Sequence, residues 1–281
     1  MEANPLRAGS AVHLAPEATI VCDLVASGTP YDNAMTTFAK EFSFVDNTSV
    51  APVNDNATGT TDAQKLAALR AMAFSRLTGD MSLPPADQFP LLSEIAADLS
   101  DGVLNGMQGS TPLTVGSVPL REDIQNRFSD ALARCFADTA SNHTGLAADK
   151  IGVPPFAKVA YTNTYRVEYV PDTMMPAAMQ GKTQFRIKVT RLSDNTAVTG
   201  LVSSGVFKLY PYMHMATKSH STPVDNTMIT ESPGGTYNCT VYYLMSTAMN
   251  GMSMGFWELK VTVDGETATL YPFVGMPMGT D

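Results

Sequence analysis

The sequence lacks the motifs that identify common catalytic and membrane proteins. No stretch approaches the roughly 20 apolar residues needed to span a bilayer. No Gly-x-Ser-x-Gly, His-Glu-x-x-His or phosphate-binding loop occurs. His13 and His143 have no nearby nucleophile and orienting acid of the kind that acyl-transfer chemistry needs. We therefore expect a protein without a membrane span that binds rather than catalyses.

Positive charge is also scarce. The 281 residues include 18 Lys and Arg against 27 Asp and Glu, a formal net charge of -9. Residues 1–150 contain 9 basic and 18 acidic side chains, whereas residues 151–281 contain 9 of each. Because no basic run could neutralise a phosphate backbone, we expect no binding to nucleic acid. The uneven charge, like the chain length, predicts two domains.

Cysteine is rare as well. Cys22, Cys135 and Cys239 show no Cys-x-x-Cys spacing, so a zinc knuckle or a thioredoxin-like motif has no support. Cys22 and Cys135 could pair in an oxidising compartment. Cys239 shares a period-two pattern with apolar neighbours, which predicts a buried, inert thiol.

Composition also bears on location. The first ten residues lack the apolar run of a signal peptide. Lysine is sparse, whereas Thr, Ser, Asn and Gly are abundant. This composition predicts an exported protein, periplasmic, extracellular or on the cell surface, whose leader has been removed. A cytosolic protein is the alternative.

Helical periodicity dominates the first half of the chain. Apolar residues recur at spacings of three and four in three segments: Leu66, Leu69, Ala73 and Leu77; Leu92, Ile95 and Leu99; and Ile124, Phe128, Leu132 and Cys135. We expect the third helix to open at Ser117 with Pro119 in its first turn. A shorter helix is predicted over residues 31–42. Together these segments predict a helical bundle over residues 30–150, after an N-terminal arm of residues 1–29.

The period changes to two after Gly152–Pro155. Apolar residues alternate with polar ones in two clear segments: Phe185, Ile187 and Val189; and Trp257, Leu259, Val261 and Val263. Asp264-Gly265 then supplies a tight hairpin signal. Further segments at 158–170, 205–210 and 235–244 bring the prediction to roughly six or seven strands. The expected fold class is α+β multidomain: a helical bundle followed by an antiparallel, immunoglobulin-like β-sandwich over residues 155–281.

Methionine is concentrated where strands are predicted. Twelve of the 17 methionines follow residue 173, and six lie within two short stretches, 213–215 and 245–254. A thioether is a soft, neutral ligand suited to Cu(I), especially beside an imidazole. Methionine also fills irregular cores and adaptable surfaces, and composition alone favours that packing role.

Both stretches fall at predicted strand ends, so they could converge at one tip of the sandwich. In an extended chain Met213 and Met215 share a face, while His214 points away. The predicted Cu(I) ligands are Met213, Met215, His220, Met249, Met252 and Met254, with Met245 and His214 in reserve. If the two stretches emerge at opposite ends, they cannot form one site.

The segment from Phe185 to Met278 resembles the YtkA-like or FixH-like exported β-sandwich domains. The motifs that carry the resemblance are Met213-His-Met215, His220-Ser-Thr-Pro223 and Met252-Ser-Met-Gly-Phe-Trp257. The resemblance implies copper handling through Met-rich and His-containing loops before a Gly-x-Trp strand, and with it a copper-handling partner. The first half is similar to the helical segment of exported lipoproteins from metal-respiring bacteria, notably over residues 95–106, without any implied activity.

A second hypothesis is a structural subunit of an extracellular surface assembly or filament. Ala18–Cys22 in the arm has the composition of a strand and could complete the sheet edge of a neighbouring copy. Self-association would then use adaptable contact surface from five other methionines: Met174, Met175, Met179, Met276 and Met278. A terminus that packs locally or stays disordered is the simpler alternative.

Overall fold

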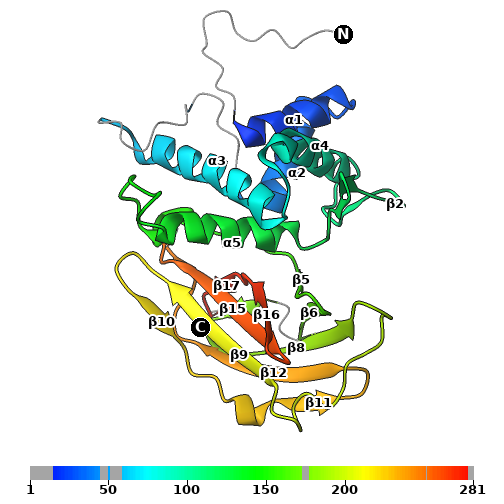
Figure 1. Ribbon diagram of the computed structural model, residues 1–281. Helices are drawn as coiled ribbons and strands as arrows, with labels where there is room; N and C mark the ends of the chain where they lie inside the picture. The colour runs from blue at the N-terminus through cyan, green and yellow to red at the C-terminus, as the bar shows by residue number, and fades with distance from the viewer. Residues whose placement is uncertain (1–14, 45–49, 51–58, 173–176, 251, 278–281) are drawn as a thin grey trace, which may run out of the picture. The chain divides into compact units, whose positions relative to one another are not determined.

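The computed structural model describes residues 15–44, 50, 59–172, 177–250 and 252–277. The chain divides into two compact units. The first combines residues 1–121 with 134–146, and the second combines residues 122–133 with 147–281. Helices make up most of the first unit and antiparallel sheets most of the second, so the fold is α+β (Figure 1).

The first unit contains four complete helices among its described residues: α1 (Pro16–Ala26), α2 (Tyr31–Phe42), α3 (Asp62–Asp80) and α4 (Gln88–Leu99). A 3-10 turn, η1 (Pro85–Asp87), precedes α4. A capping box begins α3: the Thr61 side chain accepts a hydrogen bond from the Gln64 backbone N–H, and the Gln64 side chain accepts one from the Thr61 backbone N–H. Phe38, Phe42 and Phe74 are fully buried in this unit.

The predicted strand over Ala18–Cys22 is wrong, because these residues lie within helix α1. Pro16 occupies the first turn, where its missing N–H removes no helical hydrogen bond. Ile20, Val21 and Leu24 are all buried, and their spacing matches one face of a helix. The part of the predicted arm before residue 15 lies outside the described residues.

The predicted start of the third helix is also wrong. Two short hairpins precede helix α5 (Ile124–Ala137): β1 (Met107–Gln108) with β2 (Thr111–Pro112), and β3 (Thr114–Val115) with β4 (Val118–Pro119). Gly116 adopts a positive φ of 59° in the turn between β3 and β4. A Gly in that conformation favours a tight hairpin, so Ser117 lies in the turn and Pro119 ends β4, and neither residue opens a helix.

The second unit is built on two antiparallel sheets. The four-stranded sheet has the order β10 (Ser219–Ser221), β9 (Phe207–His214), β15 (Phe256–Val263) and β16 (Glu266–Leu270). The five-stranded sheet has the order β11 (Thr230–Ser232), β12 (Thr236–Tyr243), β8 (Gly181–Arg191), β6 (Tyr165–Pro171) and β5 (Val159–Tyr161).

Shorter elements complete this unit. β13 (Ala248–Met249) pairs with β14 (Met252–Ser253), and β17 (Val274–Gly275) pairs in parallel with β7 (Ala178–Met179). Two 3-10 turns, η2 (Ala148–Ile151) and η3 (Asn226–Met228), lie in the connections. The first turns of α5 also belong to this unit, where the Asn126 side chain donates hydrogen bonds to the carbonyls of Ala157 and Val159.

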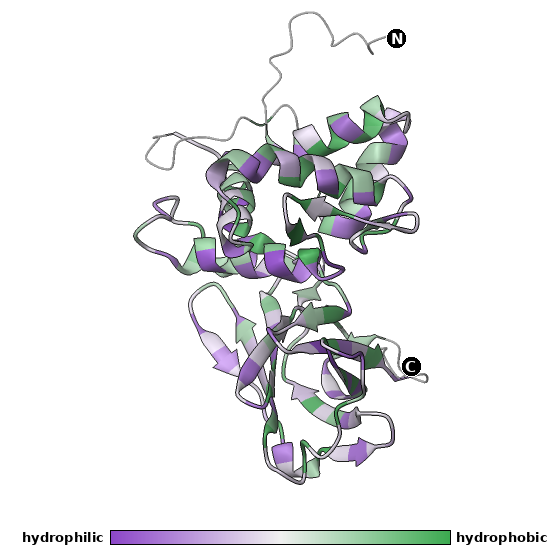
Figure 2. Cartoon of the chain, turned by 45° about the vertical axis from the view of Figure 1, so that its right-hand side comes forward, coloured by the Kyte–Doolittle hydropathy of each residue, from purple (hydrophilic) through white to green (hydrophobic). Residues whose placement is uncertain are grey.

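The inward residues of both sheets form a single hydrophobic core. Hydrophobic and hydrophilic residues alternate along the strands (Figure 2), and the inward ones are buried. Phe207 of the four-stranded sheet stacks on Tyr237 of the five-stranded sheet, with ring centroids 4.4 Å apart. Trp257 meets Tyr243 edge to face at 4.8 Å. The two sheets therefore pack as the layers of a sandwich.

None of the three cysteines forms a disulfide, so Cys22 and Cys135 are not paired. Cys22 is exposed, whereas Cys135 and Cys239 are buried. Cys239 turns into the core as its alternating pattern predicts, and burial raises the pKa of its thiol. Among the described helices, none combines the length and apolar character needed to cross a membrane.

Candidate functional site

Strands β9 and β15 bring the two Met-rich stretches to the same end of the four-stranded sheet. β9 ends at His214, β15 begins at Phe256, and these two residues are paired across the antiparallel strands. The chain that leaves β9 therefore lies beside the chain that enters β15. Met215 and Met254 flank this junction. The two Met-rich stretches therefore emerge at the same end of the sheet, which a shared site would require.

Gly255 makes the close approach at this junction possible. A Cβ on Gly255 would collide with the carbonyl oxygen of His214 and would lie 3.3 Å from the Met215 Cα. Its φ of 136° is also one that residues with a side chain rarely adopt. The Gly in the Met-Ser-Met-Gly-Phe-Trp motif therefore lets the two Met-bearing backbones contact each other.

Four of the methionines near this junction take part in core packing. Met213 is only 1% exposed and lies opposite Trp257 in the register of β9 and β15. Met215, Met245 and Met254 are partly buried against the same core. Flexible thioether side chains are well suited to fill the irregular end of a sandwich core. Packing is therefore the better-supported role for Met213.

Met249 and Met252 are different, because both are exposed. They lie directly opposite each other in the β13–β14 hairpin, with exposed fractions of 38% and 63%. Directly opposed residues project from the same face of a hairpin, with Cβ atoms about 4.5–5.5 Å apart. These two thioethers are consequently adjacent and accessible to solvent.

The two histidines of this region face different environments. His220 lies in the exposed strand β10 and is paired with Met213 of β9, so both side chains leave the sheet on the same face. His214 projects from the other face of β9, away from Met213, as the alternation predicts. Its Nε2 lies 2.7 Å from Oε2 of Glu258, so this reserve ligand already has a protein partner.

Within the described residues, no three His, Cys, Asp or Glu side chains gather in a group that could hold a metal ion. A metal centre in this part of the chain would depend on thioether ligands. Such ligands select soft ions such as Cu(I) over Zn²⁺ or Ca²⁺, which prefer imidazole, thiolate or oxygen ligands.

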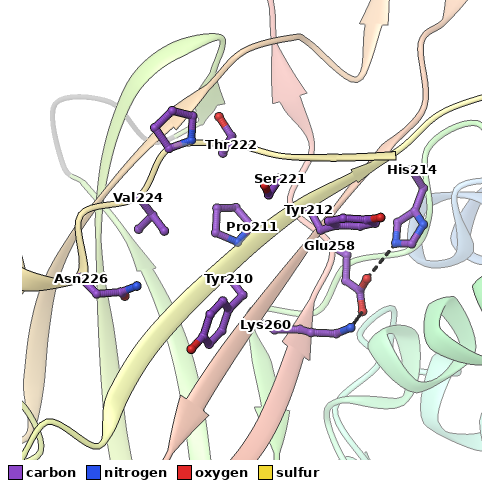
Figure 3. Close-up of a pocket in the computed structure, with 11 residues that line it drawn as sticks. Tyr210, Pro211, Tyr212, His214, Ser221, Thr222, Val224, Asn226, Glu258 and Lys260 are labelled. Atoms are coloured by element: carbon purple, nitrogen blue, oxygen red, sulfur yellow. Dashed lines mark hydrogen bonds and ion pairs between the residues drawn. The ribbon is translucent and has the colours of Figure 1, made fainter. Parts of the chain in front are cut away.

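A second feature, which the motifs did not predict, is a groove on the outer face of the four-stranded sheet. Tyr210, Tyr212 and His214 project outward from β9 and lie opposite Lys260, Glu258 and Phe256 of β15. The groove has a volume of about 870 Å³ and is also lined by residues of the segment that follows β10. Figure 3 shows the two tyrosine rings along β9 and the His214–Glu258–Lys260 chain beside them.

Glu258 is the buried charge of this groove, with only 7% of its surface exposed. Burial by itself would raise the pKa of its carboxyl group, but hydrogen bonds from His214 and Lys260 outweigh it and hold the pKa below the ordinary value. The Lys260 Nζ lies 3.1 Å from Oε1. The carboxylate therefore stays ionised, with one donor on each oxygen.

Aromatic contacts fix the orientation of the His214 ring. The ring stacks on Phe256 with centroids 4.6 Å apart and an interplanar angle of 17°. Tyr212 packs against it edge to face at 5.1 Å. The alternation in Tyr210-Pro-Tyr-Met-His214 could have predicted the outward residues of β9, but the neighbouring strand and its register are set only by the fold.

No protein-family model matches the chain, and no curated protein matches it. Among solved structures, the chain is similar to the Lin-41 filamin domain with a TM-score of 0.26 and 13% sequence identity, over 38% of this chain and 90% of that one.

Proposed function

We propose that this protein binds Cu(I) through methionine side chains at the end of the sandwich where β9 ends and β15 begins. The observation that carries the proposal is the His214–Phe256 pair, because it brings two separate Met-bearing segments to one end of one sheet. Met249 and Met252 are the accessible donors, and Met215 and Met254 lie at the junction itself. His220, exposed on the edge strand, is the candidate imidazole ligand.

The chemistry of the region favours this ion over others. Thioethers are neutral and soft, so they bind Cu(I) without a compensating charge. Because Met213 is buried, we assign it to the core packing beneath the site and not to the copper ligands. The resemblance of residues 185–278 to YtkA-like and FixH-like copper-associated domains supports the same ion. Export from the cell and a copper-handling partner are further parts of the proposal.

We also infer that the sandwich is of the immunoglobulin type. In that architecture one sheet has the strand order D-E-B-A and the other contains C, F and G as neighbours. Here β11-β12-β8-β6 and β9-β15-β16 reproduce these two orders, with β10 beside β9 in the place of an added C′ strand. In this assignment the Met-rich segments are the connection that follows strand C and the one that precedes strand F.

A competition titration tests the copper proposal. Under anaerobic, reducing conditions, the wild-type protein should remove Cu(I) from a chromogenic chelator such as bicinchoninate. Replacing both Met249 and Met252 with Ile should weaken Cu(I) binding by at least roughly tenfold, which corresponds to about 1.4 kcal/mol. Because both side chains are exposed, thermal unfolding of the apoprotein should stay unchanged.

Met228→Ile provides the matched control. Met228 is 70% exposed but lies in η3, outside both Met-rich stretches. Its replacement should leave Cu(I) affinity as it is. The proposal fails if the wild-type protein takes no copper from the chelator, or if the double variant binds Cu(I) as well as the control does.

A further inference from the structure

We propose that the outer groove of the four-stranded sheet binds a neutral oligosaccharide. We call this surface the tyrosine groove and define it by Tyr210, Tyr212, His214, Ser221, Glu258 and Lys260. Its volume of about 870 Å³ falls within the range of ligand-binding clefts, roughly 300–1,000 Å³.

Two exposed aromatic rings lie along β9, between the other two strands that line the groove. Tyr210 and Tyr212 are 49% and 37% exposed, whereas Leu209 and Met213 of the same strand are buried. Residues two apart on a strand project from the same face, so the two rings lie in a row. A tyrosine ring offers a large, rigid, apolar face with a polar hydroxyl at its tip. Such a pair suits the C–H faces of successive sugar rings.

The strands on either side of β9 supply hydrogen-bonding groups. A carboxylate has about four lone-pair positions, and His214 and Lys260 each occupy one on Glu258. Lys260 donates one of the three N–H groups of its ammonium to that carboxylate and is about half exposed. Ser221, opposite Tyr212 in the register of β9 and β10, adds a hydroxyl. The groove thus offers donors and acceptors together, as sugar hydroxyls require.

Charge balance favours a neutral ligand. The carboxylate of Glu258 faces the ammonium of Lys260, so these two opposite charges balance each other. The buried carboxylate of Glu258 would repel an anion such as a phosphate. Aromatic rings can bind a quaternary ammonium, but here the ammonium of Lys260 would repel it. A polyhydroxylated neutral molecule encounters neither repulsion.

The tyrosine groove is independent of the copper proposal. Tyr210, Tyr212 and His214 project from one face of β9, whereas Met213 projects from the other. Loss of copper binding would therefore leave the groove and its ligand unaffected, and the two proposals can fail separately.

Affinity electrophoresis of the whole chain tests the inference. Native gels would contain one of four neutral polysaccharides: mixed-linkage β-glucan, xyloglucan, galactomannan or dextran. The protein should be retarded by at least one, and replacing Tyr210 and Tyr212 with Ala should reduce the affinity at least roughly tenfold. Tyr242→Ala is the matched control, because Tyr242 is 45% exposed on β12 of the other sheet.

Retardation lost in the Tyr210 and Tyr212 double variant but kept in the control supports the proposal, provided that thermal unfolding shows both variants folded. Absence of retardation by all four polysaccharides overturns it. Equal retardation of wild type and double variant overturns it as well, as does retardation by alginate or heparin alone, since these are acidic.

Discussion

His214 and Glu258 lie on adjacent strands and are joined by a hydrogen bond of 2.7 Å, although 44 residues separate them in the chain. The bond links the two features that distinguish this sandwich. His214 is the last residue of β9, where the Met-rich junction begins, and its ring forms one end of the tyrosine groove.

The first prediction concerns acid stability. The pKa of Glu258 is lower in the folded protein than its ordinary value of 4.5, so its ionised form favours the folded state. That stabilisation is complete above the ordinary pKa and is lost as the pH falls through the lower, folded-state pKa. Urea unfolding from about pH 6 to about pH 3 should show a steeper loss of stability in wild type than in Glu258→Gln. Parallel pH profiles would contradict the role assigned to this carboxylate.

The second prediction concerns the partner of that carboxylate. His214→Ala removes the hydrogen bond to a buried charge and the stack on Phe256, so it should lower the free energy of unfolding by about 1–3 kcal/mol. His220→Ala, at an exposed position, should change it by less than about 0.5 kcal/mol. Chemical denaturation of both variants measures the difference, and similar values for the two histidines would count against the assignment.

The third prediction concerns Gly255. Gly255→Ala places a Cβ against the His214 carbonyl and also strains the backbone at a φ of 136°, so it should destabilise the protein by more than about 3 kcal/mol. Gly265→Ala is the control for backbone strain alone. Gly265 has a φ of 83° but nothing within 4 Å of the added atom, so its cost should be about 1–2 kcal/mol. Equal costs for the two variants would show that the close approach at the junction is absent.

The fourth prediction separates buried from exposed methionines. Met213→Ala opens a cavity in the core and should cost about 2–5 kcal/mol of stability. Met252→Ala, at a position that is 63% exposed, should cost less than about 0.5 kcal/mol. Thermal or urea unfolding of the apoproteins decides the matter. A small effect at both positions would mean that Met213 is free to act as a ligand.

Local sequence patterns predicted much of the second unit. The alternation of Phe185, Ile187 and Val189 correctly identifies β8, and that of Trp257 to Val263 correctly identifies β15. Asp264 and Gly265 both adopt positive φ, as the predicted two-residue hairpin requires. These predictions succeeded because burial on one face of a strand imposes period two on the sequence itself.

The same kind of pattern failed where a segment was too short to show a period. Ala18–Cys22 contains five residues that suit either a strand or one turn of a helix, and burial of Ile20, Val21 and Leu24 on one face decided for the helix. At Ser117, helix-start chemistry was present, but the positive φ of Gly116 closed a hairpin instead.

The sequence by itself determined which residues of each strand face inward, because alternation is a property of neighbouring residues along one chain. Only the tertiary structure decided which strands became neighbours. The two sheets pack on one core, and β15 pairs with β9 in a single register. This pairing places Glu258 beside His214 and Met254 near Met215. Register between distant strands depends on the packing of the whole core, so no local pattern contains it.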